Sequence, residues 1–84
     1  MAGRRQTLRR VLSGRSDANV RFDSVRRLLR ELGFVERQRG SHHIFRKDGV
    51  PERLVLQRDG KHAKPYQVRQ VRKVILNYLL GERE

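Results

Sequence analysis

The sequence contains no cysteine, only two prolines and only nine acidic residues among 84. Without cysteine, the chain has no disulfide framework and no cysteine-based zinc site, which fits a reducing cytoplasm. It also has no hydrophobic run long enough to cross a bilayer, and its N-terminus lacks the apolar stretch of a secretory signal. We therefore expect a cytoplasmic protein without a membrane partner.

Positive charge is what the chain has in excess. It carries 21 lysines and arginines, which gives a formal net charge of +12 at pH 7. Like charges at this density repel one another and oppose folding, so a polyanion or an acidic protein is the expected partner. Nucleic acid is the first candidate, because phosphate binding by basic residues releases counterions.

Length and hydrophobic spacing predict one small domain with a basic extension. Residues 1–20 form the extension, in which Leu8, Val11 and Leu12 fall at the spacing of a short helix. Residues 16–19 read as a loop. The domain spans residues 21–80, and residues 81–84 form a C-terminal tail.

A first helix of the domain is predicted after Phe22, with Asp23 or Ser24 as the capping residue. Its apolar stripe consists of Val25, Leu28, Leu29 and Leu32, and Gly33 provides the left-handed stop.

Three strands and a closing helix follow. The strands are predicted over residues 34–39, 42–47 and 52–57, with Gly40 and Asp48-Gly49 at the turns. Residues 58–64 read as a basic connection, and Pro65 opens the last helix. The expected fold is α+β in the order helix, three antiparallel strands, helix. Both helices cover one sheet face, and the other face stays open.

Two adjacent histidines begin the second strand, and strand parity sends them to opposite faces. If the large Phe45 fills the core, His43 points inward with it and His42 stands on the open face. If Ile44 is the core residue, the two roles exchange. Phe45 buries more area, so we favour His42 as the reactive group and keep His43 as the fallback.

The residue pattern favours histidine chemistry over metal chemistry. The acidic residues are scattered without paired ligand spacing, so we expect no metal and no cofactor. A histidine can cleave RNA by taking the proton from a ribose 2′-OH, which then attacks the adjacent phosphate. Arg46, Lys61 and Lys64 are candidates to stabilise the phosphate charge, and His62 is a candidate acid. The backbone N–H groups near Pro65-Tyr66 offer a further anion site.

The blocks of this pattern resemble a known family. The chain is similar to the HicA toxins of bacterial toxin–antitoxin pairs over roughly residues 22 to 80. The likeness rests on Gly33-Phe34, Gly40-Ser41-His42-His43-Ile44-Phe45, Asp48-Gly49 and Lys64-Pro65. Residues 1–20 look like the extension of longer members.

The resemblance implies a fold like that of double-stranded-RNA-binding domains and an mRNA interferase activity. It implies His42 as the catalytic histidine and an acidic HicB-like antitoxin as the partner besides mRNA. Gly40 and Ser41 of the same segment join Arg46, Lys61, His62 and Lys64 as RNA-binding candidates.

Two points stay open at the level of the sequence. Residues 56–60 depart from the family pattern, which leaves the second catalytic group undefined, and the paired histidines leave the register open by one residue. A non-catalytic RNA-binding module and a basic accessory subunit held by an acidic protein are the alternatives to a toxin.

Overall fold

A computed structural model of the chain describes residues 3–80. Residues 1–2 and the predicted tail at 81–84 lie outside the described residues. The described elements are α1 (Gly3–Ser13), η1 (Asp17–Asn19), α2 (Phe22–Glu31), β1 (Val35–Arg39), β2 (His42–Lys47), β3 (Val50–Asp59), β4 (His62–Ala63) and α3 (Pro65–Asn77).

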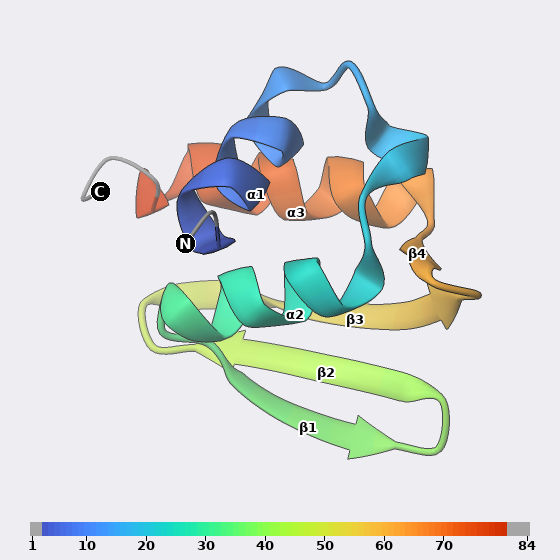
Figure 1. Ribbon diagram of the computed structural model, residues 1–84. Helices are drawn as coiled ribbons and strands as arrows, with labels where there is room; N and C mark the ends of the chain where they lie inside the picture. Colours follow the sequence, from blue (N-terminus) through green and yellow to red (C-terminus); the bar gives the residue numbers. More distant parts are fainter. Residues whose placement is uncertain (1–2, 81–84) are drawn as a thin grey trace.

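The sheet is antiparallel, with its strands in the order β1-β2-β3-β4 (Figure 1). The predicted turns at Gly40 and at Asp48-Gly49 are confirmed, since Arg39 pairs with His42 and Lys47 pairs with Val50. The prediction of three strands is wrong. β3 is longer than expected, and the segment read as a connection turns back at residues 60–61 to form β4 against it.

Helix α2 begins at Phe22, and its start differs from the prediction. No side-chain cap is formed at its N-terminus, so neither Asp23 nor Ser24 has the expected role. Phe22 is fully buried, and its N–H donates to the carbonyl of Lys61 at 3.0 Å. A tertiary contact therefore satisfies one of the N–H groups that the first turn of a helix leaves without an intrahelical partner.

The end of α2 follows the prediction. Gly33 adopts a φ of +103°, and its N–H donates to the carbonyl of Arg30 at 3.0 Å. The N–H of Phe34 donates to the carbonyl of Leu29 at 2.9 Å. This pair of bonds is the Schellman arrangement, which turns the chain from the helix into β1.

All three α-helices lie on one side of the sheet (Figure 1), so the predicted open face is present. The core between helices and sheet includes Phe45, Leu54 and Leu56 from the strands. Helix α1 contributes to the same core through Leu8 and Val11. Its C-terminal end is fixed by Arg72 of α3, which donates to the carbonyl of Val11 at 3.1 Å. The extension therefore packs on the domain, and the boundary near residue 20 stays a prediction.

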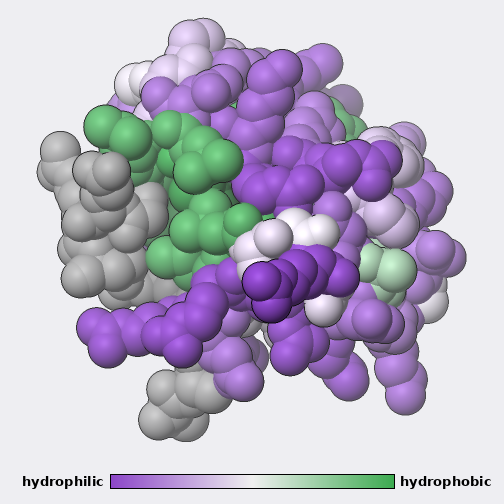
Figure 2. Space-filling model, turned by 90° about the horizontal axis from the view of Figure 1, so that it is seen from above, coloured by the Kyte–Doolittle hydropathy of each residue, from purple (hydrophilic) through white to green (hydrophobic). Residues whose placement is uncertain are grey.

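The helical side of the molecule is mainly hydrophilic. Figure 2 looks down on this side and shows a hydrophobic patch among the hydrophilic residues. Leu76 and Leu79, near the end of α3, are both exposed. The open sheet face lies on the opposite side of the molecule (Figure 1).

Candidate functional site

The two adjacent histidines lie on opposite faces of β2, as strand parity requires. Phe45 is fully buried and His43 is 4% exposed, whereas His42 is exposed on the open face. Of the two arrangements predicted from the sequence, the structure therefore adopts the one with Phe45 in the core and His42 on the open face. Of this pair, only His42 is exposed to solvent.

A polar network under the sheet holds His43. Nδ1 of its ring lies 2.8 Å from Oε2 of Glu36, and the ring packs edge-on against Phe22 with 5.0 Å between centroids. Glu36 also accepts hydrogen bonds from Arg26 at 2.7 and 3.3 Å. Burial raises the pKa of the Glu36 carboxyl group, but the hydrogen bonds from Arg26 and His43 outweigh it, and the net pKa lies below the usual value. The network keeps an ionised carboxylate beside His43.

Strand register defines the neighbours of His42. It pairs with Arg39 of β1 and with Gln57 of β3. Directly opposite residues on one face of a sheet have Cβ atoms about 5 Å apart. Gln57 also donates through Nε2 to the hydroxyl of Ser41 at 3.0 Å, which ties the Gly40-Ser41 turn to β3. The histidine is therefore flanked by a cation and an amide on a fixed hairpin end.

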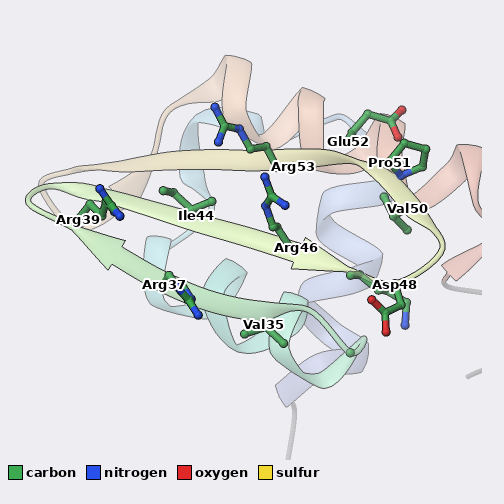
Figure 3. Close-up of a pocket in the computed structure, with 12 residues that line it drawn as sticks. Val35, Arg37, Arg39, Ile44, Arg46, Asp48, Val50, Pro51, Glu52 and Arg53 are labelled. Atoms are coloured by element: carbon green, nitrogen blue, oxygen red, sulfur yellow. The ribbon is translucent and has the colours of Figure 1, made fainter.

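The rest of the open face is rich in arginine. We define the arginine face as Arg37, Arg39, Arg46 and Arg53 together with the apolar Val35 and Ile44. Figure 3 shows these side chains on β1, β2 and β3, where they line a concavity of about 890 Å³. All four arginines are exposed, and none forms an ion pair within residues 3–80. Arg37, Arg39, Arg53 and Gln57 were not among the sequence candidates, although the turn at residues 40–41 fixes the first two opposite Ile44 and His42.

The predicted phosphate-binding residues divide between two places. The turn that carries Lys61 lies at the same end of the sheet as the Gly40-Ser41 turn (Figure 1), and His62 pairs with Asp59 beside it. His62 therefore stands on a strand next to β3 rather than in a loop. Arg46 lies on the same face as His42 but four residues along β2, or about 13 Å away.

The beginning of α3, where the sequence suggested an anion site, uses several of its N–H groups inside the protein. The carbonyl of Lys64 accepts the N–H groups of Gln67 at 2.9 Å and Val68 at 3.1 Å. The N–H of Lys64 in turn donates to Oε1 of Gln67 at 3.3 Å. Pro65 has no N–H, so most donors of this first turn are already used inside the protein. Lys64 itself is half-buried at the start of the helix.

Residues 3–80 show neither a cluster of metal ligands nor a membrane-spanning helix. No group of three or more His, Asp or Glu side chains lies close enough together to hold a metal ion. Over the same residues, no helix is long and apolar enough to cross a membrane.

These observations define a small α+β domain with a four-stranded sheet, one face of which is uncovered, cationic and carries an exposed histidine. Residues 22–75, more than half of the chain, match the family model described as the HicA toxin of bacterial toxin–antitoxin systems. The protein belongs to the HicA toxin family, which confirms the resemblance found in the sequence. The match begins where α2 begins and leaves α1 outside. Comparisons with curated proteins and with solved structures found no match.

Proposed function

We propose that this toxin is a metal-independent endoribonuclease that cleaves mRNA and thereby blocks translation, with His42 as the catalytic residue. The observation that carries the proposal is the division of the two histidines. His42 stands exposed on a cationic face beside Arg39, whereas His43 is buried and bonded to Glu36. The order α2-β1-β2-β3-α3 supports the expected likeness to double-stranded-RNA-binding domains.

The chemistry requires a base, a stabilised phosphate and an acid. His42 would take the proton of a ribose 2′-OH, and the oxygen would attack the adjacent phosphorus, leaving a 2′,3′-cyclic phosphate. Arg39 lies directly opposite His42 and would balance the charge that develops on the phosphoryl oxygens. The leaving 5′-oxygen needs a proton, for which His62 at the same end of the sheet is the candidate donor.

The remaining candidates would bind RNA around this centre. Gly40 and Ser41 form the turn beside His42, and Lys61 lies in the turn at the same end of the sheet. Arg46 would bind an RNA phosphate at some distance from the one that is cleaved. Lys64 is half-buried and would contribute mainly through its charge.

The antitoxin would be an acidic protein of the HicB type that covers the open face. The support is charge complementarity, because the formal charge of the chain is +12 and the four arginines of the face are free of ion pairs within residues 3–80.

The test is an RNA-cleavage assay with the wild type and with His42→Ala, each in the presence and absence of a chelator. Loss of a positioned general base typically lowers the rate about 10²- to 10⁴-fold. We expect such a loss in His42→Ala, with RNA affinity little changed, and no effect of the chelator on the wild type. His62→Ala serves as the comparison, with a smaller loss expected if water can replace the acid.

Wild-type cleavage rates in His42→Ala would contradict the assignment of His42. RNA binding by the wild type without any cleavage would favour the second candidate function, a non-catalytic RNA-binding module. That alternative is favoured by one observation, namely that the arginine face extends well beyond the surroundings of His42.

A further inference from the structure

The arginine face is larger than a single phosphodiester group needs. Its concavity of about 890 Å³ reaches from Arg39, next to His42, to Arg53 and Pro51 at the far end of the sheet. Volumes of this order accommodate ligands of the size of a few linked nucleotides. The face therefore has room for RNA on one side of the reacting phosphate.

Four arginines and two carboxylates, those of Asp48 and Glu52, line this concavity, so positive charge is in excess there. Arg26 and Arg58 bind carboxylates at 2.7 and 2.9 Å, and Arg72 binds Asp17 at 3.0 Å. The four arginines of the face have no such partner within residues 3–80. Their guanidinium groups are left to bind an anion from outside, and planar guanidinium is well suited to phosphate.

Apolar and basic side chains alternate over the face. Register places Arg37 opposite Ile44 and Arg46 opposite Val35. Val55 of β3 lies opposite Ile44 on its other side. Val35 is 65% exposed and Val55 is 37% exposed, so these side chains offer bare hydrocarbon to a ligand. Phosphates can thus meet arginines while bases lie against valine, isoleucine and guanidinium planes.

The shape of the face selects between paired and unpaired RNA. Three neighbouring strands give it a width of about 10 Å. An A-form duplex presents a convex surface with its bases stacked inside, so it cannot place bases in a concavity of this width. Unpaired nucleotides can be splayed out and can enter it.

We propose that the arginine face binds a few unpaired nucleotides adjacent to the cleaved phosphate, so that the substrate of this toxin is single-stranded RNA. The inference rests on the proposed function for the position of the reacting phosphate. It adds Arg37 and Arg53 as RNA-binding residues and names the class of substrate.

The test measures binding in a His42→Ala background, so that the RNA is not consumed. The probe is a short, unstructured, fluorescently labelled RNA, free or annealed to its complement. Removal of one specific arginine contact weakens binding about tenfold or more, so Arg37→Ala/Arg53→Ala should bind the free RNA about 100-fold more weakly. The matched control is Arg27→Ala/Arg69→Ala, which removes two exposed arginines from α2 and α3 and should change affinity only a few fold.

A second measurement uses the unaltered face. An arginine-specific reagent should modify Arg37 and Arg53 in the free protein, and bound single-stranded RNA should protect them while Arg27 and Arg69 stay reactive. Equal losses in the two double variants, equal affinity for free and annealed RNA, or no protection would each overturn the proposal. Antitoxin binding that depends on Arg37 and Arg53 while RNA binding does not would assign the face to the protein partner instead.

The two proposals can fail separately. If wild-type protein cleaves RNA and the arginine variant binds and cleaves as well as the wild type, the inference fails and the ribonuclease proposal stands. If the face binds unpaired RNA but the wild type cleaves none, the ribonuclease proposal fails and the inference stands as a binding property.

Discussion

His43→Ala should lower the stability of the fold, whereas His42→Ala should lower activity and leave stability nearly unchanged. His43 is 4% exposed, bonds to the Glu36 carboxylate at 2.8 Å and packs against the Phe22 ring. A hydrogen bond to a charged group contributes about 1.5–3 kcal/mol, and an aromatic pair about 0.5–1.5 kcal/mol. We therefore expect His43→Ala to lower the free energy of unfolding by about 2–4 kcal/mol, a large share of the total for a domain of this size.

The measurement is thermal and urea unfolding followed by circular dichroism. For a domain of this size, 1 kcal/mol corresponds to about 4–8 °C in Tm, so His43→Ala should melt at least about 10 °C below the wild type. His42 is exposed and its ring has no hydrogen bond within residues 3–80, so His42→Ala should stay within about 0.5 kcal/mol of the wild type. The reasoning is refuted if the two variants melt together, or if His42→Ala is the less stable one.

Two further predictions concern Glu36 and Gly33. Because the pKa of Glu36 is lowered in the folded protein, its contribution to stability is present above the unfolded pKa of about 4.3 and is lost as the pH falls below it. Urea midpoints between neutral and acid pH should show this loss, and a Glu36→Gln variant with the same pH dependence would contradict it. Gly33→Ala places a Cβ at a φ of +103° and 2.6 Å from Nζ of the flexible Lys47, so strain of about 1–2 kcal/mol should lower Tm. An unchanged Tm would show that the turn after α2 relaxes freely.

Local signals explain why much of the fold could be predicted. The stripe of α2, the stop at Gly33 and the turn at Asp48-Gly49 each depend on residues within a few positions of one another. Strand β4 was missed because two residues are too short for any periodicity, and tertiary pairing with Arg58 and Asp59 of β3 and with Arg21 defines it. The predicted start of α2 was wrong for a related reason, since the chain there is held by a tertiary hydrogen bond from Phe22 to the carbonyl of Lys61, nearly forty residues away in sequence.

The candidate site was predictable in part. Strand parity and the size of Phe45 together predicted that His43 is buried and His42 exposed, because the larger side chain gains more from burial in the core. The neighbours of His42 depend on how β1 and β2 pair across the turn at residues 40–41. Extending the pairing from Arg39 and His42 would have found Arg37 opposite Ile44. To place Gln57 and Arg53 on the same face, the full length of β3 had to be known, and local signals predicted a shorter strand.

Four carboxylates are engaged in contacts that do not involve the arginines of the open face, although one of them, Glu52, lines the concavity with Asp48. Asp17 binds Arg72 of α3, Asp23 binds Arg58 beside Phe22, and Glu36 binds Arg26 under the sheet. Glu52 accepts a hydrogen bond from Tyr78 at 2.6 Å, which lowers the pKa of its carboxyl group. These four carboxylates connect helices to the rest of the fold.

On the proposals made above, RNA and antitoxin would compete for the arginine face. An acidic protein bound to Arg37, Arg46 and Arg53 would displace the RNA without any contact with His42, since the same guanidinium groups cannot bind both. Inhibition should therefore weaken as salt rises, in parallel with RNA binding. It should also persist in His42→Ala, because that variant keeps the whole arginine face.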